Sequence, residues 1–494
     1  MPFTTPIRTM TKLPLSPRHA VRPKPFSRGA TLVVSASAPT TTSTGLPLVV
    51  LKGGKKKMLV GDTPAVTLFP GAIDCVISSH LGRPPPGAGD LVLVVDGTRE
   101  SVLAYGVYNP DSTFAVRVLG FFGKNAVDLD APPPIDLDAL VQERLVAAAS
   151  LRTEALALRE VTSAFRLCNA EGDMLPGLIV DVFGGVAVVQ SSAAWIEARR
   201  GVVTACLEGL GYAVVWRAAV DMLALEGIEV SEDGEEPQGA PQVVVIEEHG
   251  VKFNVDTSSQ KTGGYCTSTL DWTRPTCVRL IARPDSLTRA TRFARSPGFY
   301  CDQRDNRRVI REIANRKSVA DLCCYSGGFA IYAALGGATR VVGVDSSQQA
   351  VDLATSNAAL NGVDGVCRFV KADASDWMDE AIKAGEEYDL VVLDPPKLAP
   401  TRKSLTNATR KYVSLNTKAM RLVKDGGLLM TCSCSGAMTQ GGTFRSAVIA
   451  AAARRAGVQA SLVSKAGAGA DHVIDLRYGE GEYLSNYIVR VTKL

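Results

Sequence analysis

The sequence predicts an α/β protein in which a C-terminal Rossmann-like sheet follows an α+β central domain and a small N-terminal β-barrel. Three observations lead to this prediction. Strand-like and helix-like segments alternate through residues 299–494, which is typical of a mostly parallel sheet with helices on both faces. Residues 137–256 combine one amphipathic helix with strands. Residues 46–124 contain short β-like runs separated by Gly, Pro and Asp turns.

The composition fits a multidomain globular protein without a structural metal. The chain has 494 residues, of which 46% are apolar and 21% charged, enough for two to four domains with their own cores. No apolar run approaches the ~18 residues that span a membrane. Eleven cysteines form no Cys-x-x-Cys pair and there are only four histidines. This argues against a zinc site or a disulfide framework and fits a reducing compartment.

Residues 1–45 read as an organellar transit peptide. They are rich in Ser and Thr, contain six Lys or Arg, and no acidic residue appears before Asp62. The Pro-rich, weakly helical character and the run Val-Val-Ser-Ala-Ser-Ala at 33–38 favour the chloroplast over the mitochondrion. The alternative is a merely disordered tail. Because the net charge of +4 lies in this segment, bulk charge is no argument for a nucleic-acid partner.

The next two blocks carry a basic cluster and a helix followed by strands. In residues 46–124, β-like runs are expected at 48–51, 91–95, 101–108 and 114–119. Four lysines follow the first run and could hold phosphates, although a solvated turn is the alternative reading; they are Lys52, Lys55, Lys56 and Lys57. In residues 137–256 we expect a helix at 140–158, a turn-rich lead at 166–181 into a strand at 186–190, a loop at 231–241, and a hairpin of 243–246 with 251–255.

The C-terminal block should place its ligands at one edge of the sheet. Strands are expected at 319–323, 341–344, 368–371, 390–393, 428–432 and 487–491, and helices at 328–335, 348–360, 408–423 and 443–456. In a parallel sheet of this kind, ligands bind at the carboxyl ends of the strands. The residues that follow these strands are therefore the candidates for function.

The first strand leads into a glycine turn that suits a nucleoside. Glycines let the backbone approach a ligand, but the turn is not Gly-x-Gly-x-x-Gly, so no pyrophosphate cradle is specified. Asp345 ends the next strand, where it can reach a ribose diol, and Asp373 follows the third, placed to accept from an adenine amine. Acids at three successive strand ends suit a cationic sulfonium nucleoside better than a dianionic pyrophosphate. The candidate cofactor residues are Asp321, Tyr325, Gly327, Gly328, Phe329, Asp345, Asp373 and Asp394.

A carboxyl group and a thiol follow two further strands. Asp394 is held by Pro395 and Pro396, so it lacks the freedom of a loop acid and can hydrogen-bond a base edge where a ring nitrogen is protonated. A structural turn acid is the alternative. A Cys434 thiolate could add to C6 of a cytosine and make C5 nucleophilic toward the cofactor methyl. A lone Cys is more often an inert apolar residue, and we assign that part to Cys432.

These segments resemble the class I S-adenosylmethionine-dependent large-subunit ribosomal RNA cytosine-C5 methyltransferases of the RlmI group. The matching stretches are 299–307, 321–329, 344–345, 394–397 and 433–436. The resemblance implies that residues 46–124 form an RNA-binding PUA domain, and that 299–494 form the methyltransferase domain. It also implies that Asp345 binds ribose, Asp373 adenine and Asp394 the target base, with Cys434 as the nucleophile. Ribosomal RNA is the expected partner, and a homodimer is a further expectation.

Two departures keep alternatives open. Other RNA cytosine-C5 enzymes carry a second Cys directly after the double proline; here that position is Lys397, so another base must take the C5 proton, and we list Lys397 as an RNA contact. Leu398 replaces the aromatic residue that guanine N2 methylation favours there. Guanine N2 methylation remains one alternative. A non-catalytic RNA-binding ribosome assembly factor is the second, and a nicotinamide oxidoreductase is a distant third.

One segment does not fit the family pattern. The family runs Gln-Lys-Thr-Gly directly into Phe-Tyr-x-Asp-Gln-Arg, whereas here residues 264–298 intervene. That stretch has six Arg, no Lys, two Asp and two Cys and shows no helical or strand period. We interpret it as a retained intron or a mistaken gene model. The alternative is a genuine loop that contacts RNA through its arginines.

Overall fold

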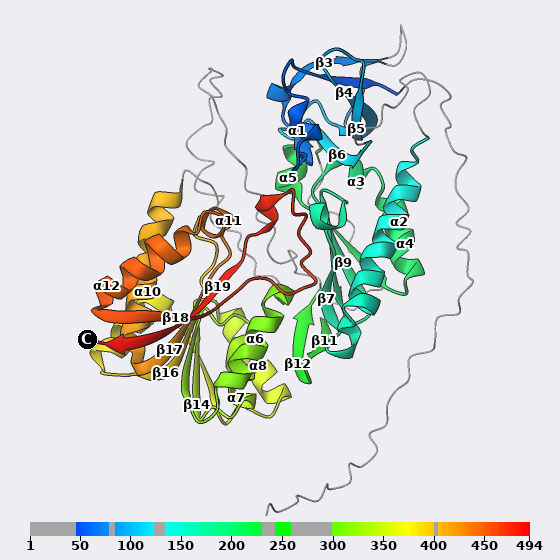
Figure 1. The fold of residues 1–494 in the computed structure, drawn as a ribbon. Coiled ribbons are helices and arrows are strands. Elements are labelled where there is room, and N and C mark those ends of the chain that lie inside the picture. Colours follow the sequence, from blue (N-terminus) through cyan, green and yellow to red (C-terminus); the bar gives the residue numbers. More distant parts are fainter. Residues whose placement is uncertain (1–45, 79–83, 123–133, 230–242, 258–298, 400–403) are drawn as a thin grey trace, which may run out of the picture. The chain divides into compact units, whose positions relative to one another are not determined.

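The computed structural model describes residues 46–78, 84–122, 134–229, 243–257, 299–399 and 404–494 (Figure 1). The expected transit peptide, the segment 264–298 and the loop at 231–241 lie outside the described residues, and their assignments stay predictions. None of the described helices is long and apolar enough to cross a membrane.

The N-terminal strands form a mixed six-stranded sheet with the order β2-β6-β5-β4-β1-β3. Its pairs are antiparallel except that β1 lies parallel to β4. Alternate residues of β1 and β4 enter two cores: Val49, Val92 and Val94 pack in one, and Val50 and Leu93 in the other, as the period of two requires. A barrel was expected; the described strands form a sheet edged by β2 and β3. The elements are β1 Leu48–Leu51, α1 Lys57–Val60, β2 Thr67–Leu68, β3 Ile73–Ile77, β4 Asp90–Val95, β5 Val102–Tyr108 and β6 Val116–Phe121.

The central part contains a four-stranded sheet of order β10-β9-β8-β7 and a separate β11-β12 hairpin. The expected turn-rich lead at 166–181 holds only for residues 170–177, because two strands, β7 and β8, occupy its two ends. The charged residues Arg166 and Asp181 made these segments look like turns in the sequence. In the structure both residues are buried and form an ion pair with each other. The elements are α2 Leu137–Ser150, β7 Ala164–Asn169, β8 Leu178–Phe183, β9 Val186–Ser191, α4 Arg200–Gly209, β10 Ala213–Ala218, β11 Val243–Glu248 and β12 Val251–Asp256.

The C-terminal sheet has seven strands in the order β15-β14-β13-β16-β17-β19-β18. The first five are parallel, whereas β19 runs antiparallel between β17 and β18. The expected Rossmann-like sheet is thereby confirmed, with an antiparallel strand that the alternation did not predict. The elements are α6 Arg304–Ile313, β13 Ser318–Leu322, α7 Gly328–Leu335, β14 Arg340–Asp345, α8 Gln348–Leu360, β15 Cys367–Lys371, α9 Ala374–Lys383, β16 Tyr388–Leu393, α10 Leu405–Leu422, β17 Val423–Ser433, α12 Ala450–Ala456, β18 Val458–Ala466 and β19 Ser485–Lys493.

Each face of this sheet has its own core. On β16, Leu390 and Val392 pack in the cluster that includes α6 and α7, while Val391 and Leu393 pack in the cluster that includes α9, α10 and α12. Figure 1 shows these two sets of helices on opposite sides of the sheet. Strands buried on both faces read as continuous apolar runs, which is what residues 390–393 show.

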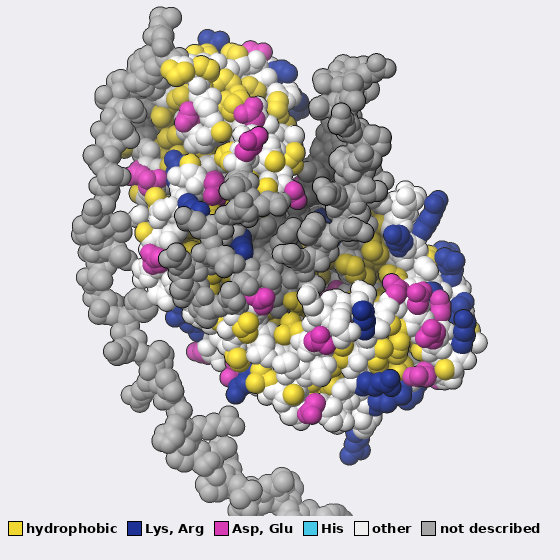
Figure 2. Space-filling model, turned by 180° about the vertical axis from the view of Figure 1, so that it is seen from behind, with side chains coloured by type: hydrophobic (Ala, Val, Ile, Leu, Met, Phe, Trp, Pro, Cys, Tyr) yellow, Lys and Arg dark blue, Asp and Glu magenta, His cyan; other side chains and the backbone are white. Residues whose placement is uncertain are grey.

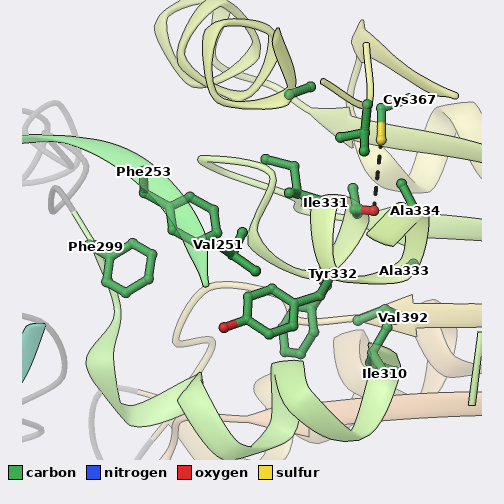
Figure 3. Close-up of a cluster of buried hydrophobic side chains, with 14 of the residues drawn as sticks. Val251, Phe253, Phe299, Ile310, Ile331, Tyr332, Ala333, Ala334, Cys367 and Val392 are labelled. Carbon is green, nitrogen blue, oxygen red and sulfur yellow. Dashed lines mark hydrogen bonds between the residues drawn. The ribbon is translucent and has the colours of Figure 1, made fainter. Parts of the chain in front are cut away.

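The β11-β12 hairpin is part of the first of these cores. Phe253 on β12 lies 4.9 Å from Phe299 and 6.4 Å from Tyr332 of α7, measured between ring centroids (Figure 3). The hydroxyl of Tyr332 donates to Oε1 of Glu248 at 2.9 Å. The hairpin therefore fixes the segment that begins at Phe299, which enters the active site a few residues later.

Candidate active site

Asp394 and Cys434 leave neighbouring parallel strands at the carboxyl edge of the sheet. In the register of β16 and β17, Leu393 lies opposite Thr431, so Asp394 stands level with Cys432, and Cys434 lies two residues further on. Adjacent strands are about 4.8 Å apart. Both side chains therefore emerge at the same part of the edge where ligands bind in such sheets.

The two cysteines have different surroundings. Cys432 is fully buried in the core, its Sγ accepts a hydrogen bond from Asn486 Nδ2 at 3.2 Å, and burial raises its pKa well above the usual range for a thiol. Cys434 is partly exposed. Since a thiolate is the reactive form and must be reached by its substrate, Cys434 is the better placed of the two.

Asp394 is held in a form that can exchange a proton near neutral pH. Burial and the charge of Asp302 raise its pKa to about 7, against the lowering effect of a hydrogen bond from Gln303. That bond runs from Gln303 Nε2 to Asp394 Oδ2 over 2.9 Å. A carboxyl group whose pKa lies near the working pH is suited to general acid–base chemistry.

Tyr300, which the sequence did not single out as a site residue, lies beside these groups. Burial raises the pKa of its phenol well above 10, with further contributions from the charges of Tyr325, Asp302, Cys434 and Asp394. It is therefore a neutral aromatic group near both Cys434 and Asp394, and its ring meets that of Tyr325 edge to face at 5.6 Å. The signal was present, because Tyr300 lies in the matched stretch 299–307, but nothing in the sequence showed which way it faces.

The turn after β13 is built around backbone conformations that few side chains adopt. Gly327 has φ of 78°, but Cys323 and Tyr325 also have positive φ, at 65° and 46°. Asp345 at the end of β14 supports the turn, because its Oδ2 accepts from the Tyr325 amide at 3.0 Å and its Oδ1 from the Ser347 amide at 2.9 Å. Strained backbone of this kind clusters at ligand sites.

Asp321 is the clearest sign of a cationic ligand. It is fully buried, its Oδ2 accepts from the Ala330 amide at 2.9 Å, and its Oδ1 has no partner within the described parts of the chain. Burial, together with the charges of Asp394 and Asp345, raises its pKa to about 8. An orphaned carboxylate oxygen next to two further acids fits the positively charged S-adenosylmethionine, which supplies a transferable methyl group when bound.

Four of the expected cofactor residues have structural roles of their own. Phe329 is buried in the core, so its side chain is not offered to a ligand. A Cβ on Gly327 would lie 3.0 Å from the Phe369 ring, and one on Gly328 would lie 3.0 Å from Arg307 Cδ; packing alone explains both glycines. Asp373, which is exposed, accepts from the Ser375 amide as the N-cap of α9.

Of the expected RNA contacts, the four lysines of the basic cluster lie far from this site in the sequence, whereas Lys397 follows Asp394 by three residues. All four lysines of the basic cluster, Lys52, Lys55, Lys56 and Lys57, are exposed. Lys56 pairs with Asp96 at 2.9 Å, and Lys52 donates to the carbonyl of Gly71. Lys397 beside the active site is partly buried. In the face drawn in Figure 2, basic side chains alternate with acidic ones over the described surface. No group of three metal-binding side chains occurs among the residues described.

The comparisons with known proteins agree with this geometry. Residues 287–457 match the family model of S-adenosylmethionine-dependent methyltransferases. A solved protein from Streptococcus mutans, described as a methyltransferase, shares the fold with a TM-score of 0.64 at 16% identity, over 90% of this chain and 99% of that one. A methyltransferase structure complexed with S-adenosylhomocysteine gives a TM-score of 0.65 over the same shares. The fold and the strand-end acids thus define an S-adenosylmethionine-dependent methyltransferase.

The relatives give the family. The ribosomal RNA large subunit methyltransferase I of Photobacterium profundum is 35% identical over 81% of this chain and 90% of its own length. The enzyme of the same name from Klebsiella pneumoniae is 31% identical over 91% of this chain and its whole length. The chain belongs to the ribosomal RNA large subunit methyltransferase I family.

Proposed function

We propose that this enzyme methylates C5 of a cytosine in the large-subunit ribosomal RNA of the chloroplast, through a covalent adduct with Cys434. Family membership supports the methyl donor and the class of RNA. The choice of C5 depends on one observation: a partly exposed thiol and a carboxyl group with a pKa of about 7 follow neighbouring strands and share Tyr300 as a neighbour. The chloroplast is proposed from residues 1–45 alone, with the mitochondrion as the alternative.

Each group has one part in the proposed reaction. The Cys434 thiolate forms a bond to C6 of the cytosine while the ring nitrogen N3 takes a proton from Asp394, which leaves C5 electron-rich. C5 takes the methyl group of the bound donor. Loss of the C5 proton to a base then allows the carbon–sulfur bond to break, which restores both the aromatic ring and the thiolate. Asp394 regains its proton as N3 releases it.

The N-terminal domain and Lys397 would bind the RNA. We propose that residues 46–124 are a PUA-like RNA-binding domain in which Lys55 and Lys57 contact phosphates, since both are exposed on the same short segment. Lys397, next to Asp394, would contact the backbone of the target nucleotide. The cytosine must leave its stack to reach the strand ends, as single-stranded loops in RNA allow.

The product nucleoside tests this proposal. Unmodified large-subunit rRNA transcript is incubated with the full chain and S-adenosylmethionine carrying a labelled methyl group, then digested to nucleosides and separated by mass. We expect 5-methylcytidine as the labelled product. Labelled N2-methylguanosine would show that the enzyme methylates guanine instead of cytosine. Cofactor binding without any labelled nucleoside would point to a non-catalytic assembly factor, and Asp345→Ala serves as a cofactor-binding control.

A further inference from the structure

A chain of two buried side-chain amides ends on the Asp394 carboxyl group. Asn306 Nδ2 donates to the Gly467 carbonyl at 3.1 Å and to Gln303 Oε1 at 2.6 Å. Gln303 Nε2 in turn donates to Asp394 Oδ2 at 2.9 Å. Because a backbone carbonyl only accepts, Gly467 fixes the orientation of the Asn306 amide, and Asn306 then fixes that of Gln303. One oxygen of Asp394 is thereby always met by a donor.

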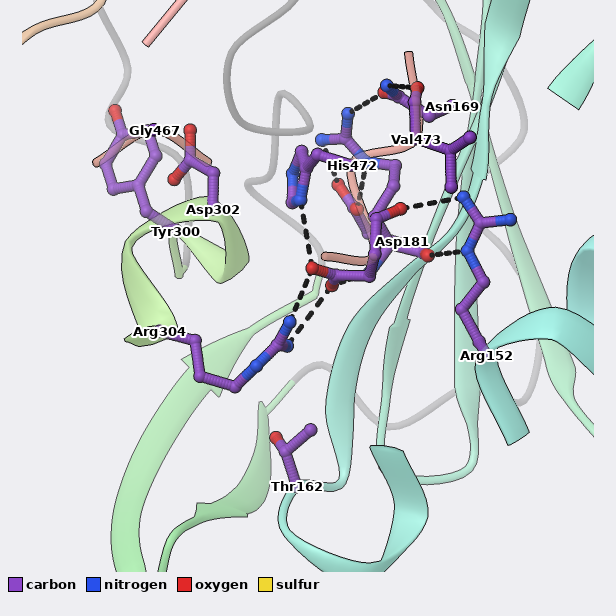
Figure 4. A network of polar contacts seen from close by, with 12 residues as sticks. Arg152, Thr162, Asn169, Asp181, Tyr300, Asp302, Arg304, Gly467, His472 and Val473 are labelled. Carbon is purple, nitrogen blue, oxygen red and sulfur yellow. Dashed lines mark hydrogen bonds and ion pairs between the residues drawn. The ribbon is translucent and has the colours of Figure 1, made fainter. Parts of the chain in front are cut away.

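A second carboxylate lies on the same turn. Asp302 is 5% exposed, and its Oδ2 accepts from the Tyr483 hydroxyl at 2.7 Å. Its Oδ1 has no partner within the described residues. The Gly469 amide donates to the backbone carbonyl of Asp302 at 2.9 Å. Residues 467–483 thus hold both Asp302 and Asn306, and Figure 4 shows Asp302 beside Tyr300 and Gly467.

The other charged or titratable groups around Asp394 come from every element packed on it. They are Asp302 and Tyr300 before α6, Arg307 on α6, Asp321 and Cys323 at β13, Cys432 on β17, and Cys434 just after β17. Arg307 is the only cation of the set; its Nε and Nη2 donate to Glu248 at 2.8 and 2.7 Å, and its Nη1 donates to the Tyr300 carbonyl at 2.9 Å. Asp302 directly precedes Gln303, whose amide contacts Asp394, and the charge of Asp302 raises the pKa of Asp394 by more than the charge of Arg307 lowers it.

We propose that Asp302, Gln303 and Asn306 are positioning residues for Asp394: the two amides turn one of its oxygens toward the cytosine ring, and the Asp302 carboxylate holds the proton on Asp394 until the ring nitrogen takes it. This inference rests on the proposed cytosine-C5 methylation. The proton moves from Asp394 to N3 while the sulfur bonds to C6, and it returns when the adduct breaks. None of the three residues needs to touch the substrate.

Two substitutions should move the titration of Asp394 in opposite directions. Asp302→Asn removes a like charge and should lower the pKa of Asp394, because the charged form is no longer opposed. Gln303→Met removes a hydrogen-bond donor to the ionised Asp394 carboxylate and should raise the pKa of Asp394. Since the protonated carboxyl group is the active form, activity falls as pH rises through this pKa. The alkaline limb of the rate profile should shift down by roughly one pH unit in Asp302→Asn and upward in Gln303→Met.

The experiment measures single-turnover methyl transfer to the rRNA transcript across pH, together with the infrared carboxyl band of the protein alone, assigned with Asp394→Asn. Two variants serve as controls. Asp305→Asn removes one negative charge from a less buried place on α6, and Tyr483→Phe removes the hydroxyl that contacts Asp302 but keeps the Asp302 charge. Neither control should shift the alkaline limb of the pH–rate profile to lower pH. Opposite shifts in both readouts support the inference, and unmoved or parallel shifts overturn it. A wild-type enzyme without methyl transfer overturns the proposed function instead, while the carboxyl band still decides the positioning.

Discussion

The Asp345 carboxylate accepts a hydrogen bond from the Tyr325 amide, 3.0 Å away, and so ties the turn after β13 to the end of β14. Tyr325 lies in the left-handed region of φ, as does Cys323 nearby. Side chains are uncommon there, and such conformations persist only where the surroundings hold them. Asp345 thus shapes the cofactor turn in addition to its proposed contact with ribose.

Removing this carboxylate should weaken cofactor binding. In Asp345→Ala the Tyr325 amide loses a charged acceptor and the ribose loses its partner, so we expect the Kd for S-adenosylhomocysteine to rise roughly 10- to 100-fold. Titration calorimetry on the full chain measures it. Asp352→Asn on the exposed side of α8 is the matched control and should bind as the wild type does. Unchanged affinity in Asp345→Ala would place the nucleoside elsewhere.

Asp321 should make the free protein less stable as pH rises. Its folded pKa is about 8, against about 3.9 in an unfolded chain. Its contribution to stability is therefore full below pH 4 and is lost as pH rises toward 8, because the unfolded state releases the proton first. Asp321→Asn removes this slope, so it should gain stability relative to wild type between pH 5 and 8.

Urea unfolding at several pH values measures this difference. Asp389→Asn is the control: burial raises the pKa of Asp389, but hydrogen bonds from Ser318 and Lys424 hold it at about 2. Its substitution should change the free energy of unfolding by a constant amount over the same window. A wild-type minus Asp321→Asn difference that stays flat from pH 5 to 8 would show that Asp321 is ionised in the folded protein.

Asp471 should be the most sensitive carboxylate for folding. It is fully buried, pairs with Arg304 and His472, and accepts from the Arg166 amide at 2.8 Å. Asp471→Ala leaves the buried Arg304 guanidinium without its counterion, which should cost about 3–5 kcal/mol of unfolding free energy. Glu312→Gln breaks the exposed Arg308–Glu312 pair and should cost less than about 1 kcal/mol. Equal losses in the two variants would mean that the buried cluster is not needed for the fold.

Much of the fold could be predicted because its strands and helices follow simple periods. The helices at 328–335 and 348–360 end where the sequence placed them, and the strand-end acids Asp345 and Asp394 lie where the alternation predicted. The sequence could not show that Arg166 and Asp181 belong to buried strands, because charge normally marks a turn and only their pairing across β7 and β8 removes that cost. Asp373 was expected to contact adenine, whereas its carboxylate caps α9, a role that an Asp before a helix commonly takes.

The reactive residues of the active site could be predicted from the sequence, but the residues that hold them in place could not. Cys434 and Asp394 could be chosen because each follows an apolar run that ends at the ligand edge. The residues that support the site, Tyr300, Asp302 and Gln303, lie far from Asp394 in the sequence. Gln303, for example, precedes Asp394 by 91 residues, and contacts between such distant residues leave no local pattern in the sequence. Tertiary packing alone shows that this segment faces the carboxyl group.

The central claim is that the sulfur of Cys434 attacks the target base, and a trapped adduct tests it most directly. Large-subunit rRNA transcript containing 5-fluorocytidine blocks loss of the C5 substituent, so the wild-type enzyme with S-adenosylmethionine should form a covalent protein–RNA complex that survives denaturing electrophoresis. Cys432→Ala should still form it, and Cys434→Ser should not. A complex that persists in Cys434→Ser, or one that vanishes only in Cys432→Ala, would contradict the assignment.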